Sequence, residues 1–172
     1  MLTGGNQERG LRAGTQNVSG IVGFAEACRQ AAIELPDSQV KIAHLRNRLE
    51  SQIQKSIPDL VVNGDIENRL CNTLHVSIPD VPNGAILARV RSILAISTGS
   101  ACNSSVEEPS HVLQAMRMSD HLVNGALRLS LGRDTTVEEV DATVQILTEA
   151  VVFIRKVSSS EVLSKNDNIF DL

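Results

Sequence analysis

The sequence has 172 residues, of which 42% are hydrophobic and 21% are charged, a composition typical of one soluble globular domain with its own core. Its net charge of -4 and its aromatic content of only 2% argue against a protein that binds nucleic acid through a basic surface and base stacking. No apolar run reaches the length of a membrane span and no signal-peptide pattern opens the chain, so we expect a cytoplasmic protein that does not contact a membrane.

The three cysteines include no C-x-x-C pair. This spacing favours neither a zinc site nor a redox dithiol, so we expect reduced thiols and no metal site.

The chain begins with an irregular segment, residues 1–16, in which glycines alternate with polar and basic residues. Its glycines match neither the Walker pattern nor a G-x-G-x-x-G turn after a strand, so alone they are weak evidence for phosphate binding. Arg9 and Arg12 are expected to order this loop or an interface between subunits.

Two helices are expected next, one from Val18 that ends at Pro36 and one that runs from Asp37 to just before Pro58. Each has one apolar stripe: Val18, Ile21, Val22, Ala25, Cys28 and Ala32 in the first, and Ile42, Leu45, Leu49 and Ile53 in the second. On such a stripe Cys28 is expected to be a small buried hydrophobe.

Short apolar runs between turn residues then predict four strands, at 59–62, 73–78, 93–97 and 126–131. Helices are expected at 83–92 and 110–117. The predicted fold is α/β, with a small mixed or antiparallel sheet covered by helices.

The final helix has the clearest signal for its start, because Thr136 and Glu139 form a capping box. Its apolar residues repeat at spacings of three and four as far as Ile154. We expect a small α/β domain over residues 17–157 and, because the sequence becomes polar and serine-rich, a flexible tail over 158–172.

Cys102 lies in a loop, 97–109, whose first part reads STGSACNSS. These small residues offer the thiol access rather than packing, and access is one requirement for a nucleophilic cysteine. Composition alone leaves a structural loop cysteine equally open.

Arg128 alternates with leucines in the run ALRLSL, which assigns it to the strand face opposite the buried one. It is either a solvated strand charge or a two-pronged partner for a carboxylate, a task that suits arginine better than lysine.

Three stretches together resemble the cysteine desulfurases, the pyridoxal-phosphate (PLP) enzymes of the NifS and IscS kind. They are GGNQERGLRAGTQN, STGSACNSS and LRLSLGRDTTVEEVD, and the similarity runs from about Gly4 to Val157. Thr3 and Asn6 depart from the family's H-G-G-G pattern. The resemblance implies the C-terminal small domain of a fold-type I PLP enzyme.

The resemblance also implies a role for each matching residue. Cys102 would attack the sulfur of L-cysteine, become a persulfide and release alanine, and its glycine- and serine-rich loop would let it move between substrate and acceptor. Arg128 would bind the substrate α-carboxylate. Thr15 would hydrogen-bond the PLP phosphate held by the other subunit of a homodimer.

The lysine that holds PLP in the family has no counterpart here, since the lysines of this sequence do not match its S-x-H-K setting. They are Lys41, Lys55, Lys156 and Lys165. We therefore expect the C-terminal portion of a desulfurase that works with a PLP-bearing large domain and a sulfur-acceptor protein, for iron–sulfur cluster or thio-cofactor assembly. The alternatives are a stand-alone persulfide carrier and a non-catalytic association module.

Overall fold

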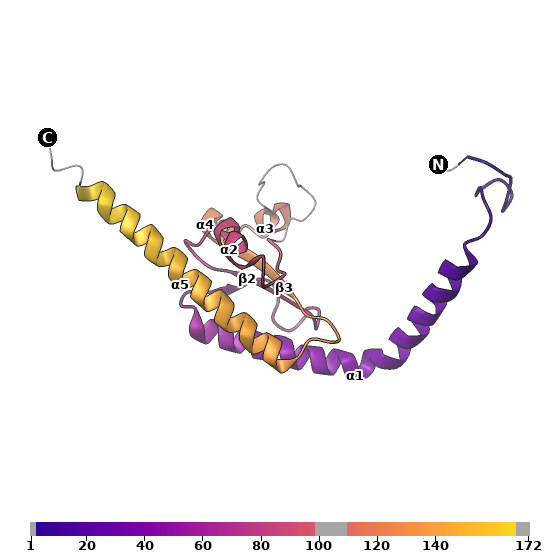
Figure 1. Cartoon of the computed structure of the whole chain (residues 1–172), viewed down its shortest axis with the longest axis horizontal. Helices are drawn as coiled ribbons and strands as arrows, with labels where there is room; N and C mark the ends of the chain where they lie inside the picture. The colour runs from indigo at the N-terminus through magenta and orange to yellow at the C-terminus, as the bar shows by residue number, and fades with distance from the viewer. Residues whose placement is uncertain (1–2, 99–109, 168–172) are drawn as a thin grey trace. The chain divides into compact units, whose positions relative to one another are not determined.

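The computed structural model describes residues 3–98 and 110–167. The chain divides into two compact units, one up to Ser38 and one from Gln39 onward. Helix α1 (Val18–Ser56) contributes its first half to one unit and its second half to the other (Figure 1).

In the first unit, the glycine-rich segment before α1 is irregular, as the sequence predicts. Arg12 orders it: its Nε donates to Glu8 Oε1 at 2.8 Å, and its Nη1 donates to the carbonyl oxygen of Gly14 at 2.6 Å. Backbone φ is positive at Glu8, Arg9 and Gly10, so the chain turns tightly where the guanidinium then fixes it.

The two helices expected around Pro36 are one helix, so the prediction that Pro36 ends the first helix is wrong. A proline inside a helix removes one N–H donor, but the hydrogen bonds on either side can carry the helix through. The apolar stripe of the first half is exposed, and Cys28 is exposed with it. Cys28 is therefore not the buried hydrophobe predicted, because spacing shows which residues share a face and not whether anything covers that face.

The second unit contains a three-stranded antiparallel sheet, which confirms the predicted fold class. Its strands, β1 (Val61–Val62), β2 (Thr73–Ser77) and β3 (Ala126–Ser130), lie in the order β1-β2-β3. In the β2–β3 register, His75 lies opposite Arg128.

One face of this sheet is buried under helices. The second half of α1, α2 (Asn83–Val90) and α5 (Val137–Asp167) supply the covering side chains, and Figure 1 shows α5 crossing the second half of α1. The sheet residues in this core are Leu74, Val76, Leu127 and Leu129. Arg48 of α1 also donates to both carboxylate oxygens of Asp141 of α5, at 2.7 and 2.8 Å.

A second small cluster forms around two short helices, α3 (His111–Ala115) and α4 (Asp120–Asn124), of which α4 was not expected from the sequence. Leu113 and Val123 pack there with Ala126 of β3. Gly125 joins α4 to β3 so close to the backbone of Ile78 that a Cβ at this position would collide with the Ile78 carbonyl. The absence of a side chain is what permits this approach.

The run 93–97 is not a strand, contrary to the prediction. The amides of Ile93 and Leu94 both donate to the carbonyl of Val90, so the chain turns directly after α2. Leu94 and Ile96 then pack against the core while Ile93 stays exposed. The run thus packs onto the core, and only Ser97 pairs with the sheet, in an isolated antiparallel bridge with Arg128.

The capping box of α5 is confirmed: the amide of Thr136 donates to Glu139 Oε2 at 2.9 Å, and the amide of Glu139 donates to Thr136 Oγ at 3.2 Å. The helix continues to Asp167, which differs from the loose structure expected from Ser158 onward. Ser159 and Ser160 donate their hydroxyls to backbone carbonyls of the preceding turn, at 2.8 Å each. Serines can thus remain within a helix even where the composition of the segment predicts that the helix ends.

Candidate active site on the polar face of the sheet

A row of polar residues crosses the sheet on the face opposite the helical core. Asn63 follows β1, and its backbone N–H donates to the backbone carbonyl of His75 at 2.8 Å. His75 lies opposite Arg128 in the β2–β3 register, and Arg128 pairs in turn with Ser97. Because directly opposite residues of antiparallel strands share a face, these four residues, which we call the polar row, lie on one surface.

Arg128 lies on this surface as its alternation with leucines predicts, and it is half-buried rather than fully solvated. Its amide donates to Ser97 O at 2.7 Å, and the amide of Ser97 donates to Arg128 O at 3.2 Å. Its Nη2 also donates to Ser97 Oγ, at 3.4 Å. The guanidinium therefore lies beside the residue that opens the loop 97–109.

Cys102, in that loop, lies outside the described residues. It follows Ser97 by only five positions in the sequence, so the chain that carries the thiol leaves the sheet next to Arg128.

His75 is the second ionisable group of the polar row. Its Nδ1 lies 2.9 Å from Asn63 Nδ2, which also donates to Ser77 Oγ at 2.8 Å. Ser77 is fully buried, with 0% of its surface exposed, and Asn63 Oδ1 is buried without a hydrogen-bond partner among the described residues. Burial lowers the pKa of His75 below its ordinary value, and the positive charge of Arg128 lowers it further.

Thr15, the third residue that the resemblance singled out, is exposed in the first unit, just after the loop that Arg12 orders. The structure thus brings Arg128 together with Ser97 and His75. Sequence reasoning missed Asn63 and His75. The available signal was the alternation of the run 73–78, which assigns His75 to the face away from Leu74 and Val76.

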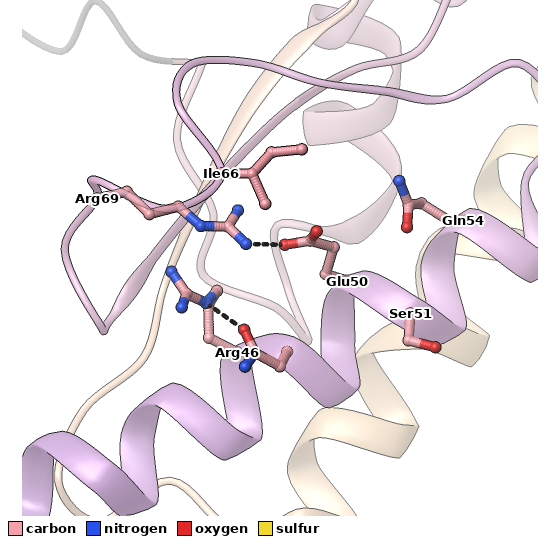
Figure 2. A pocket seen from close by; sticks show the side chains of 7 residues that line it. Arg46, Glu50, Ser51, Gln54, Ile66 and Arg69 are labelled. Carbon is pink, nitrogen blue, oxygen red and sulfur yellow. Dashed lines mark hydrogen bonds and ion pairs between the residues drawn. The ribbon is translucent and has the colours of Figure 1, made fainter.

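A separate polar pocket of about 340 Å³ lies between α1 and the segment after β1 (Figure 2). Its charged side chains have partners within the chain. Arg69 pairs with Glu50 at 2.7 Å, although Arg69 Nε is buried without a hydrogen-bond partner in the described part of the chain. Arg46 donates to Asn47 Oδ1 at 2.9 Å and to the carbonyl of Leu70 at 3.0 Å. Burial, and then the nearby charge of Arg69, lower the pKa of Arg46. These contacts tie the segment to α1 and account for the pocket structurally.

In the part of the chain that the structure describes, no group of three or more histidine, cysteine or carboxylate side chains is arranged to hold a metal ion. Within the same residues, no helix combines the length and apolarity needed to cross a bilayer.

Comparison with known proteins identifies one family. The model of the family "Aminotransferase class-V" matches residues 3–143. A cysteine desulfurase of Bradyrhizobium diazoefficiens is 42% identical over 163 residues, which are 94% of this chain and 41% of that protein. The cysteine desulfurase IscS of Anaeromyxobacter sp. (strain K) is 41% identical over 157 residues, which are 91% of this chain and 39% of that protein.

Solved structures agree with these relatives. A NifS-like protein matches with a TM-score of 0.75 and 34% identity, over 89% of this chain and 39% of that one. The NifS-like protein from Rickettsia africae matches with a TM-score of 0.75 and 28% identity, over 88% of this chain and 39% of its own. The chain thus spans about two fifths of the length of the relatives it matches.

Proposed function

Since this chain belongs to the aminotransferase class-V family, we propose that it is the C-terminal portion of a cysteine desulfurase. Its relatives carry that name at about two-fifths identity, and the match covers about two fifths of their length. The observation that carries the proposal in this structure is the position of Arg128, half-buried on the polar face and bonded to Ser97, where the Cys102 loop begins.

Arg128 is proposed to bind the α-carboxylate of L-cysteine. A planar guanidinium offers parallel N–H donors to two carboxylate oxygens. The backbone pairing with Ser97 holds the strand, and the contact of Nη2 with Ser97 Oγ at 3.4 Å together with partial burial limits the freedom that this fork would lose when substrate binds.

Cys102 is proposed to take the sulfur. Its thiolate attacks the sulfur of L-cysteine, a sulfur–sulfur bond forms, and the carbon–sulfur bond of the substrate breaks. The electron pair of the broken bond stays with the carbon fragment, which takes up a proton and leaves as alanine. Cys102 is left as a persulfide, whose outer sulfur passes to an acceptor protein.

PLP supplies electron withdrawal from the substrate carbon in this family, but the residues present do not fit a covalently held PLP. The lysines belong to helices α1 and α5, not to the strand face that carries Arg128, and Lys41 donates to the carbonyl of Arg133. Only a contact of Thr15 with the PLP phosphate is proposed for this chain. The lysine would come from a large domain, within a homodimer or a two-chain assembly in the cytoplasm.

A persulfide carrier that accepts sulfur on Cys102 without producing it is the second candidate. The two candidates differ in whether this chain participates in breaking the carbon–sulfur bond.

Mixing this chain with the PLP-bearing N-terminal part of the Bradyrhizobium enzyme, and measuring alanine released from L-cysteine, tests the first candidate. Alanine should form, Cys102→Ala should abolish it, and Cys28→Ala and Cys71→Ala should not. Arg128→Ala should raise KM roughly tenfold to hundredfold, since a charge-assisted hydrogen bond contributes on the order of 1.5–3 kcal/mol.

A mixture that forms no alanine contradicts the desulfurase assignment. If Cys102 still becomes persulfidated by an intact desulfurase in that case, the carrier function stands instead. Mass spectrometry of the Cys102 peptide distinguishes the two.

A further inference from the structure

The polar row contains a second hydrogen-bond donor that is suited to the same ligand as Arg128. His75 and Arg128 are the two ionisable side chains of β1, β2 and β3, and they lie directly opposite one another on adjacent strands. Side chains paired in this way have Cβ atoms about 5 Å apart, close enough for both to contact one small group.

The contact of His75 with Asn63 indicates which tautomer of the ring the arrangement favours. Asn63 presents its Nδ2, a donor, to Nδ1 of the ring at 2.9 Å. A neutral imidazole whose Nδ1 accepts a hydrogen bond carries its proton on Nε2. The same Nδ2 lies 2.8 Å from the buried Ser77 Oγ, whereas Asn63 Oδ1 is buried with no hydrogen-bond partner among the residues described. Because a serine hydroxyl can accept or donate, the tautomer follows from the placement of Nδ2 beside the ring and not from the contact with Ser77.

The ring is also held in its neutral form, because burial and the charge of Arg128 both lower its pKa. No partner of Nε2 occurs among the residues that the structure describes. His75 therefore supplies an N–H donor next to a guanidinium without adding a second positive charge.

We propose that His75, positioned by Asn63, donates its Nε2–H to the carboxylate that Arg128 binds. A carboxylate has two oxygens and about four acceptor positions, so the fork of one arginine leaves room for a further donor. This inference rests on the proposed role of Arg128 and adds a second residue to the recognition of the amino-acid substrate.

The test uses the 172-residue chain and L-alanine, the proposed product, which has the carboxylate but no thiol. Nitrogen-15 NMR follows the Arg128 side-chain N–H and the His75 ring as L-alanine is added. His75→Phe should raise the dissociation constant for L-alanine roughly tenfold or more, because a hydrogen bond to a charged group is lost. His75→Gln, which keeps an N–H donor, should restore much of the affinity, and Thr73→Val, two residues away on the same strand face, should leave it unchanged.

The outcomes test the proposed role of His75 and that of Arg128 separately. If His75→Phe binds L-alanine as tightly as the parent, or if the parent ring carries its proton on Nδ1, the role of His75 is wrong and that of Arg128 stands. If the Arg128 signal shows no saturable shift, or if Arg128→Ala binds as well as the parent, the carboxylate role of Arg128 fails and the inference fails with it.

Discussion

The two halves of α1 have similar apolar spacing and opposite environments. Ile21 in the first half is 54% exposed, whereas Ile53 in the second half is 0% exposed. The second half lies under α5 and the sheet, and the first half has no such cover in the described structure. An apolar stripe thus shows which side chains of a helix need a partner, and only the remainder of the fold shows whether this chain supplies one.

The largest expected difference between the halves is in packing energy. Ile53→Ala should lower the free energy of unfolding by about 2–5 kcal/mol, because it removes a fully buried side chain from the core. Ile21→Ala, the same change in the same helix, should alter it by no more than about 0.5 kcal/mol. Urea denaturation of both variants measures this, and equal losses would show that the first half is buried in solution.

Pro36 lies two residues before the boundary between the compact units. Replacing it tests how much the proline weakens the helix where the two halves meet. Pro36→Ala restores an N–H donor and should stabilise the helix locally by up to about 3 kcal/mol. Hydrogen exchange at residues 32–40 should slow as a result. Unchanged exchange there would mean that proline does not weaken the helix at this point.

An exposed arginine of each half also forms a close pair with a carboxylate, and these two pairs should differ in how much of the fold they stabilise. Arg48 and Asp141 join α1 to α5, whereas Arg29 and Glu26 are neighbours within the first half. Hydrogen bonding from Arg48 lowers the pKa of Asp141 below 3.8, so the pair stabilises the fold above that pH and the contribution is lost as pH falls through the lowered value.

Arg48→Ala should therefore slightly reduce global stability at pH 7, and less so in high salt, since both side chains are partly exposed. Arg29→Ala should leave global unfolding unchanged. Thermal unfolding at low and high salt compares them, and an equal effect of both variants would remove the distinction.

The smallest effect is expected from modifying Cys28. A maleimide should react with this exposed thiol without denaturant and leave the unfolding midpoint unchanged. The half-buried Cys71, which packs against the core, should react more slowly. Mass mapping after brief labelling measures both, and slow labelling of Cys28 would show that its face of α1 is covered.

Much of the local structure was predictable because its signals are local. The alternation in ALRLSL placed Arg128 on the polar face, and the capping box of Thr136 and Glu139 marked the start of α5. Failures arose where a neighbour or the backbone decided the outcome. The run 93–97 packs on the core and pairs with the sheet only at Ser97, and α1 continues through Pro36.

The candidate site divides in the same way. Residue types and their order identified Cys102, Arg128 and Thr15 as candidate site residues through a family resemblance. The family match agrees with that resemblance. Alternation assigns His75 to the polar face, but nothing in the sequence places Asn63 or His75 beside Arg128, because both lie more than 50 positions before it. Only the pairing of β2 with β3 brings them beside it.

The sequence by itself determined the periodicities, the capping box and the residue types that chemistry requires, since each depends on neighbours a few positions apart. The tertiary structure decided which apolar stripe is buried, which polar residues form one row and which side chain lies beside Nδ1 of His75. Those outcomes depend on contacts between distant segments, such as the bonds from Asn63 to His75 and from Arg128 to Ser97, and such contacts form only when the sheet and its covering helices pack together.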